Sequence, residues 1–257
     1  LGEEHVLTGD TVAPYRRNIS ALDRTIPAVL RPASADPEVR IVEIANRAKT
    51  PLYPVSRGKN WGLGSRLPVR SGTAVVDLGR MNRIREVNVP QAYADVEPGV
   101  SQGELYDYLQ EHGLPLVLNV IGSGRDTSLI GNALERGIGY FDTRADDLYG
   151  LEAVLGNGRL LSTGYAHFEG SRLAPLYRQG IGPSLGDLFC QSNYGIVTRA
   201  AIPLIPAPQK GLAMVSTIPD EDRLPAFVDA LAALMRDEII RTVVHIGNRY
   251  RSESTML

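Results

Sequence analysis

Cysteine is almost absent from this chain of 257 residues, which carries only Cys190. A single cysteine excludes an intrachain disulfide and any zinc or iron–sulfur site that needs several thiolates. The four histidines show no paired spacing, so the sequence predicts no metal site. We expect His5 and His112 to face solvent, and Cys190 to be a small buried hydrophobic side chain.

An excess of positive charge and a long apolar run are also missing. Lys and Arg number 27 against 29 Asp and Glu, which gives a net charge of −2. This balance offers no basic field for nucleic acid, and no stretch approaches the roughly 18 apolar residues of a membrane span. The sequence starts at Leu1 without an initiator methionine, and nothing in it resembles a signal peptide. We therefore expect no nucleic acid or membrane partner and a cytoplasmic location.

The composition that remains is that of an ordinary globular protein. Hydrophobic residues make up 43% and charged residues 22%, which argues against disorder and provides for a sizeable core. Helix and strand patterns alternate irregularly along the chain, and this alternation predicts an α/β (α+β) fold. The length allows one large domain or two smaller ones.

The first part of the chain predicts a small α/β unit. Apolar residues at helical spacing predict a helix from Pro37 to Lys49, with Asp36 as its N-cap. Pro51 ends this helix, and Leu52 to Val55 predicts a short buried strand. A glycine-rich loop separates this strand from the next, which is predicted from Thr73 to Asp77.

The second part is richer in strands. A helix is predicted from Ser101 to His112, and Asn157-Gly158 is a strong hairpin signal. The predicted strands of this part are Ile84–Val89, Ala92–Val96, Gly150–Leu155, Arg159–Ser162 and Gly195–Leu204.

A new pattern begins near residue 212. Ala213 to Thr217 predicts a strand, and Glu221 to Met235 predicts an amphipathic helix. We interpret this pattern as the opening of another domain that is cut short at Leu257.

The loop from Ser56 to Gly64 is the first candidate site. Its glycines free the backbone to approach a ligand, and successive N–H groups can cradle a phosphate. It lacks the spacing of a Walker loop, and no Gly-x-Gly-x-x-Gly occurs in the chain, so a Rossmann site is unsupported. Composition alone favours a surface turn.

A second candidate is Gly99-Val100-Ser101-Gln102-Gly103, which matches the nucleophile elbow of hydrolases. Ser101 and Glu104 also have the spacing of a capping box, and no histidine lies in a recognisable partner motif. Helix capping is therefore the favoured interpretation. Tyr140 and Tyr194 each lie beside a glycine, and the sequence leaves open whether they are core aromatics or stack on a cofactor.

Several motifs follow one another in the chain. They are Pro54–Gly62 (PVSRGKNWG), Val87–Val89, Val96–Val100 (VEPGV), Gly131–Tyr140 (GNALERGIGY), Val154–Gly158 and Gln191–Thr198 (QSNYGIVT). In this order they resemble the flavin-binding domain of the vanillyl-alcohol oxidase and p-cresol methylhydroxylase family. The resemblance covers roughly residues 3–208.

This resemblance implies a fold and a cofactor. The fold is a two-subdomain FAD-binding domain of the p-cresol methylhydroxylase type over residues 1–209, divided roughly into 1–79 and 80–209. Residues 210–257 would begin a cap (substrate) domain that is otherwise largely absent. FAD would lie between the two α/β subdomains, with its flavin ring facing the cap.

The resemblance also assigns FAD-binding residues by position. Pro54, Ser56, Arg57, Gly58, Lys59, Asn60, Trp61 and Gly62 would wrap the pyrophosphate, mostly through backbone N–H groups. The adenosine end would be lined by Pro98, Gly99, Val100, Gly195, Ile196 and Val197. Residues along the ribityl chain and flavin would be Gly122, Ser123, Ser128, Gly131 and Asn132, with Tyr140 as a further cofactor-binding residue. No catalytic residue is assigned.

Three departures bear on the substrate. Leu63 stands where the phenol-oxidising members carry a tyrosine, and Ser123 where the oxidase subgroup places an acidic residue. The run Phe141–Arg144 also differs from the family's usual sequence. These departures argue against a 4-alkylphenol substrate. Some relatives attach flavin through a histidine of the pyrophosphate loop, where this chain offers Lys59.

The implied function is that of an FAD-dependent oxidase or dehydrogenase. Such an enzyme would transfer a hydride from an activated C–H (a benzylic, alcohol or amine carbon) of a small-molecule substrate to flavin N5, and oxygen or another acceptor would reoxidise the FAD. The alternative is a non-catalytic FAD-binding fragment or subunit that needs a cap from another chain. The expected partners are the missing cap domain or a second polypeptide, and a second copy in a homo-oligomer. A hydrolase that uses Ser101 is a distant third hypothesis.

Overall fold

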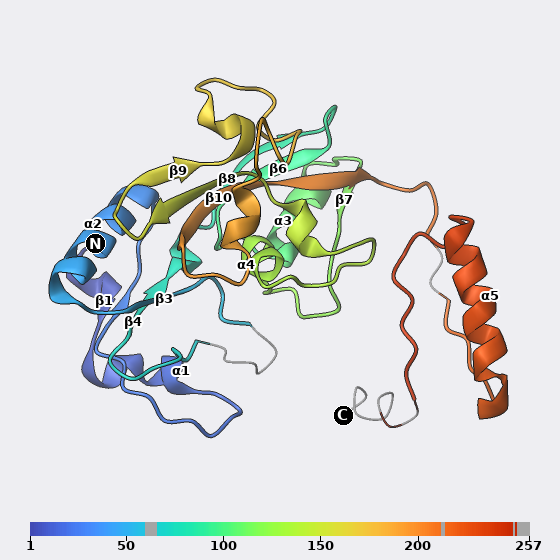
Figure 1. Cartoon of the computed structure of the whole chain (residues 1–257), viewed down its shortest axis with the longest axis horizontal. Coiled ribbons are helices and arrows are strands. Elements are labelled where there is room, and N and C mark those ends of the chain that lie inside the picture. Colours follow the sequence, from blue (N-terminus) through green and yellow to red (C-terminus); the bar gives the residue numbers. More distant parts are fainter. Residues whose placement is uncertain (60–65, 212–213, 249, 251–257) are drawn as a thin grey trace.

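Figure 1 shows the computed structural model of the chain, which describes residues 1–59, 66–211, 214–248 and 250. Its first sheet has the strand order β1-β2-β4-β3. β1 (Val6–Leu7) is antiparallel to β2 (Val29–Leu30), whereas β4 (Ala74–Asp77) runs parallel to both β2 and β3 (Leu52–Val55). The mixed sheet and the helix that connects β2 to β3 form the small α/β unit that the sequence predicts.

The second sheet is antiparallel and is built around one long strand. Its order is β5-β6-β10-β8-β9, and β7 pairs with a further part of β10. The strands are β5 (Ile84–Asn88), β6 (Tyr93–Val96), β7 (Leu116–Leu118), β8 (Tyr149–Leu155), β9 (Leu160–Ser162) and β10 (Gly195–Pro206). Two sheets with helices between their strands confirm the predicted α/β class, while the division at residues 79 and 80 stays a prediction.

The α-helices of the described chain are short. They are α1 (Ala13–Arg16), α2 (Ala35–Ala48), α3 (Gln102–Glu111), α4 (Leu129–Leu134) and α5 (Leu224–Arg236). Figure 1 shows α3 and α4 beside the second sheet and α5 well away from both sheets.

Helix α2 covers the first sheet with one apolar face. Ile41, Val42 and Ala45 of this face are buried, and Lys49 ends the helix in the left-handed conformation with φ 51°. The predicted N-cap is wrong: the extended residue before the helix is Ser34, so Asp36 already lies in the first helical turn. A carboxylate there interacts favourably with the positive end of the helix dipole but does not cap the helix.

Helix α3 begins with the predicted capping box. The Ser101 hydroxyl accepts a hydrogen bond from the Glu104 N–H at 3.1 Å, and the Glu104 carboxylate accepts one from the Ser101 N–H at 2.8 Å. Both otherwise unpaired N–H groups are thereby satisfied. The hairpin between β8 and β9 is likewise confirmed, because Gly158 turns the chain with φ 80°.

An apolar cluster joins the two sheets. It contains residues of α2, of the first sheet and its following turn, and of β8 and β10: Ile41, Val42, Val76, Leu78, Met81, Val154 and Ile196. A larger apolar cluster lies within the second unit, and a smaller one lies within the first. Cys190 belongs to the cluster of the second unit, so its predicted burial is confirmed.

The segment after residue 210 differs from the prediction at one point. Residues 214–217 form no strand, and Met214 and Val215 are 75% and 97% exposed. A strand needs a partner for its backbone groups, and no neighbouring strand pairs with these described residues. The predicted helix is present, as a 3₁₀ turn (Glu221–Arg223) followed by α5.

The capping box predicts a measurable stability difference. Ser101→Ala should lower the free energy of unfolding by about 0.5–2 kcal/mol, because an N–H at the start of α3 loses its acceptor. Ser34→Ala is a matched control, since Ser34 precedes α2 but makes no side-chain cap hydrogen bond. Urea unfolding measures both. Equal losses in the two variants would contradict the capping role, and an esterase activity abolished in Ser101→Ala at unchanged stability would favour the hydrolase.

Glu38 predicts a pH-dependent stability. This α2 carboxyl is fully buried, neither of its oxygens has a partner among the described residues, and burial, with Glu152 and Glu97 nearby, raises its pKa from 4.5 to about 9. The folded state therefore holds a proton that the unfolded state releases above its lower pKa, so stability falls as pH rises between these two values. Glu38→Gln should remove this loss, which amounts to at most about 1.4 kcal/mol per pH unit.

The measurement is urea unfolding from pH 5.5 to 8.5, a pH range that lies between the unfolded and folded pKa values of Glu38. The stability of Glu38→Gln relative to the unchanged protein should grow with pH, whereas Glu43→Gln on the exposed side of the same helix should show no such trend. Parallel curves for Glu38→Gln and the unchanged protein would show that Glu38 is ionised in the folded state.

Candidate functional site

Three of the predicted FAD-binding segments meet at the junction of the two sheets. Ser56 directly follows β3 and lies against α4, since a Cβ added to Gly131 would be 2.3 Å from the Ser56 hydroxyl oxygen. The Ser128 hydroxyl donates to the carbonyl of Pro98 at 2.6 Å and accepts from the N–H of Gly131 at 2.9 Å. The end of β3, the turn after β6 and the start of α4 are thus in direct contact.

Glycine is required at position 99 of this junction. A Cβ there would lie 2.7–2.9 Å from the backbone carbonyls of Met81, Gly79 and Leu78. The Gly99 N–H donates to the Met81 carbonyl at 2.7 Å, and the neighbouring Val100 is fully buried. The backbone of Gly99 thus packs closely on the backbone of Leu78 to Met81, the segment that leads from the first unit into the second.

The loop after β3 combines free backbone donors with two cations. Gly58 has φ +62°, and no described group accepts a hydrogen bond from the N–H of Arg57, Gly58 or Lys59. Lys59 lies 3.4 Å from the carboxylate of Asp126, on the segment that precedes α4. The predicted residues Asn60, Trp61 and Gly62, and also Leu63, lie outside the described residues.

A buried glutamine positions the predicted ribityl segment. The Gln102 side-chain amide donates to the carbonyls of Ser123 and Gly124 at 2.9 and 3.0 Å. The Ser123 hydroxyl shares a hydrogen bond of 2.6 Å with the hydroxyl of Thr127. Gly122 is exposed beside them. Gln102, from the first turn of α3, is a positioning residue that the sequence analysis treated only as part of a hydrolase-like motif.

Asn132 brings an unsatisfied polar atom to the same region. Its side-chain oxygen is buried and has no hydrogen-bond partner among the described residues. A Cβ on Gly137 would lie 2.2 Å from this oxygen, so glycine at that position makes room for the amide. An unpaired buried acceptor is costly in a folded chain unless a ligand or water supplies a donor.

The predicted adenosine residues fall into two groups. Pro98, Gly99 and Val100 lie at the junction described above, whereas Gly195, Ile196 and Val197 belong to β10 and pair with β8. Ile196 and Val197 are buried in the apolar clusters. Pro54 is exposed within β3. The contact of these residues with FAD stays a prediction.

The two tyrosines that the sequence left open are not core residues. Tyr140 is 52% exposed and Tyr194 is 62% exposed, so the interpretation as core aromatics is wrong for both. The Tyr140 N–H donates to the carbonyl of Val120 at 3.1 Å, which joins its loop to the strand end next to the predicted ribityl segment.

A buried charged network beneath this loop escaped the sequence analysis. Arg144 is 1% exposed and its Nε lies 2.7 Å from Asp147. Asn119 donates to Asp142 at 2.8 Å and accepts from the N–H of Phe141 at 3.2 Å. Burial raises the pKa of Asp147 to about 6, against the opposing effect of Arg144, and lowers the pKa of Arg144. The one sequence signal was the departure of residues 141–144 from the family's usual run.

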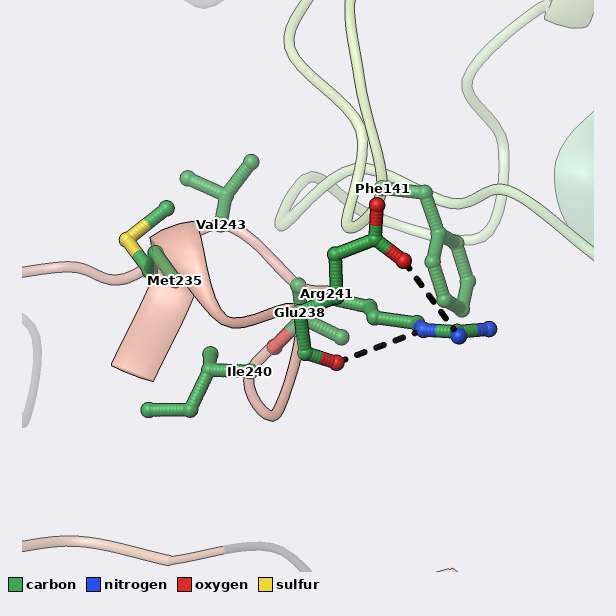
Figure 2. A pocket seen from close by; sticks show the side chains of 7 residues that line it. Phe141, Met235, Glu238, Ile240, Arg241 and Val243 are labelled. Carbon is green, nitrogen blue, oxygen red and sulfur yellow. Dashed lines mark hydrogen bonds and ion pairs between the residues drawn. The ribbon is translucent and has the colours of Figure 1, made fainter. Parts of the chain in front are cut away.

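The segment after α5 returns to the same loop. The Val243 N–H donates to the carbonyl of Tyr140 at 2.5 Å. Figure 2 shows the pocket of about 440 Å³ between them, with the ring of Phe141 next to the Arg241 side chain. Its other lining residues are Met235, Glu238, Ile240, Thr242 and Val243. The pocket therefore lies where the last described segment meets the loop of Tyr140.

The donors at the junction suit a dinucleotide. Among the described residues, the backbone N–H groups of Arg57, Gly58 and Lys59 have no acceptor and fit a pyrophosphate, since successive amides favour anions. The buried Asn132 oxygen fits a ligand that donates a hydrogen bond. Within the described ranges there is no cluster of metal-ligating side chains, and no helix is both long and apolar enough to span a membrane.

Comparisons with known proteins identify the family of the chain. The family model described as FAD binding domain matches residues 26–164. The chain is 41% identical over 254 residues to 1'-carboxy-chondrochloren decarboxylase of Chondromyces crocatus, covering 98% of this chain and 47% of the relative. It is 34% identical over 254 residues to the 4-cresol dehydrogenase [hydroxylating] flavoprotein subunit of Pseudomonas putida, covering 96% of this chain and 49% of that subunit.

A solved structure supports the fold over nearly the whole chain. The crystal structure of p-cresol methylhydroxylase with substrate bound superposes with a TM-score of 0.89 at 32% identity, covering 94% of this chain and 48% of that one. The chain spans about half the length of the relatives it matches. The predicted resemblance, fold class and cofactor are thereby confirmed. With more than half of its residues matched by the family model, the chain belongs to the FAD-binding domain family, of the type found in p-cresol methylhydroxylase.

Proposed function

We propose that this chain is the FAD-binding half of an oxidoreductase that removes a hydride from an activated carbon of a small molecule. Benzylic, alcohol and amine carbons are the candidates, and oxygen or another acceptor would take up the electrons. The observation that carries the proposal is the meeting of Ser56, Gly99 and Gly131 at one junction with unpaired amides beside it. Bound FAD supplies the hydride acceptor.

The name of one relative supports the reaction class, because it is a hydroxylating dehydrogenase of 4-cresol. The other relative is named as a decarboxylase of a carboxylated chondrochloren, a name that specifies no hydride removal. We infer a two-electron oxidation at a substrate carbon for this chain too. The departures at Leu63, Ser123 and residues 141–144 favour a substrate other than a 4-alkylphenol.

The proposed roles of the residues follow their positions. The backbone N–H groups of the loop after β3 would bind the pyrophosphate, and Pro98 to Val100 would lie beside the adenosine. Ser123, held by Gln102, and the unpaired oxygen of Asn132 would face the ribityl chain and the ring. Tyr140 would flank the ring on the side of the pocket in Figure 2.

A second candidate is an FAD-binding subunit or fragment without turnover of its own. Its support is the outer part of the chain: α5 has no buried residue, and Leu224, Val228, Leu234 and Met235 are each 37–43% exposed. An apolar helix face of this kind packs on a partner in a folded protein. We propose that residues 210–257 begin a cap domain and that the remainder of such a domain covers this face.

The first test is FAD binding through the backbone of the loop. The purified chain should take up FAD and show the visible absorption of oxidised flavin. Gly58→Val should weaken binding more than Lys59→Ala, because Gly58 has φ +62° and a Cβ there would lie 2.2 Å from the Arg66 side chain. Titration of apoprotein with FAD measures both affinities, and unfolding of the apoproteins controls for stability.

Two outcomes would contradict this reading. A colourless protein that takes up no FAD would remove both candidate functions. A larger loss of affinity in Lys59→Ala than in Gly58→Val would show that side-chain charge, and not backbone approach, dominates the binding of the pyrophosphate.

The second test separates the two candidates. We expect the 257 residues to bind FAD but to leave it oxidised under anaerobic conditions with candidate substrates, because a substrate site needs the cap. A chain extended to the length of the relatives, or supplied with a separate cap, should allow reduction of the flavin by its substrate. If a monodisperse monomer of these 257 residues binds FAD and its flavin is reduced by substrate, the cap proposal is wrong.

A further inference from the structure

Arg57 connects the loop after β3 to the second unit. Its guanidinium donates from Nη1 to Glu104 at 3.2 Å and to the carbonyl of Gly99 at 3.4 Å. Nη2 lies 3.6 Å from Asp126. All three acceptors belong to segments that follow the first sheet. The Arg57 side chain is 23% exposed, so these contacts are partly shielded from water.

Glu104 is held in place before it meets Arg57. One of its carboxylate oxygens accepts from the Ser101 N–H at 2.8 Å as part of the capping box of α3, and the other accepts from Arg57. The capping geometry leaves the carboxylate little freedom. An ion pair to a fixed partner loses less side-chain entropy than one between two mobile surface chains.

The backbone of Arg57 is held from the opposite side. Arg66 donates to the Arg57 carbonyl at 3.1 Å, and its guanidinium carbon lies 5.1 Å from the centre of the Tyr15 ring. Tyr15 in turn donates to Asp77 at the end of β4. The carbonyl of Arg57 is thus tied to the first unit and its side chain to the second.

We propose that Arg57 is a clasp between the two units, which fixes the loop for FAD by pairing with Glu104 rather than by contacting the phosphates itself. Two carboxylates already pair with the guanidinium, while among the described residues the N–H groups of Arg57, Gly58 and Lys59 have no acceptor. The pyrophosphate would then bind to amides that the clasp holds in position. This makes Arg57 a positioning residue, and the inference rests on the FAD site proposed above.

Glu104→Gln gives a clean test of the clasp. Glutamine keeps an oxygen for the Ser101 N–H, so the cap of α3 survives, but it removes the charge and turns an amide N–H₂ toward Arg57. Arg57→Gln removes the other partner. The double variant completes the cycle. The matched control is Asp107→Asn, which lies on α3 with Glu104 and breaks an exposed ion pair with Arg125.

The clasp predicts coupled effects on FAD affinity. Arg57→Gln and Glu104→Gln should each raise the dissociation constant of FAD about three- to tenfold, and the double variant should be no weaker than the worse single one. Asp107→Asn should bind FAD as the unchanged protein does.

A direct phosphate contact gives the opposite pattern. Arg57→Gln alone would then weaken FAD binding, whereas Glu104→Gln would leave FAD affinity unchanged or improve it by freeing the guanidinium. That result would overturn the clasp. Unfolding of the four apoproteins keeps the test independent of FAD: the clasp requires a non-additive loss of stability in the cycle even if no flavin binds, and additive losses would also overturn it.

Discussion

The packing of one sheet against the other is the constraint on which the site depends. Ile196 and Val154 of the second sheet bury their side chains with Val76 and Leu78 of the first, under the apolar face of α2. Burial of this kind is favourable but not directional, so it brings the units together without fixing their loops. The polar contacts around Gly99, Arg57 and Ser128 add the direction, because each needs a particular donor and acceptor at a short distance.

Two glutamates, Glu38 and Glu97, have fully buried carboxyl groups. Glu38 is buried without a partner beside the shared cluster, and its raised pKa keeps it protonated near neutral pH. Glu97 is equally buried but is paired with Arg83 at 2.6 Å and Arg85 at 3.5 Å. An unpaired buried charge is costly and a paired one less so. Glu38, the unpaired one, is therefore the buried glutamate that makes stability fall as pH rises.

Much of the fold was predictable from the sequence because local chemistry decides it. The capping box at Ser101, the turn at Gly158 and the alternation around Ile41 are signals within a few residues of one another. The N-cap of α2 was missed because Ser34 and Asp36 are both good capping residues, and backbone geometry decided between them. The strand predicted over 213–217 is absent from the described residues 214–217, because a strand exists only with a partner, which no local pattern specifies. Arg144 and Asp147 lie three residues apart in one 3₁₀ turn, but Asn119 joins them only through tertiary contacts.

That last network explains how the cofactor junction and the outer segment are connected. Arg144 donates through its backbone N–H to the carbonyl of Gly137 at 2.7 Å and through its side chain to the carbonyl of Asn119, so both ends of the loop around Tyr140 are fixed from below. Val243 then binds the carbonyl of Tyr140 from above. Asn132 and Gly137 contact each other at the other end of the same loop, so direct contacts link the described segment after α5, the loop of Tyr140 and Asn132. The departure of residues 141–144 from the family's usual run therefore falls in a loop that contacts both Asn119 and the described segment after α5.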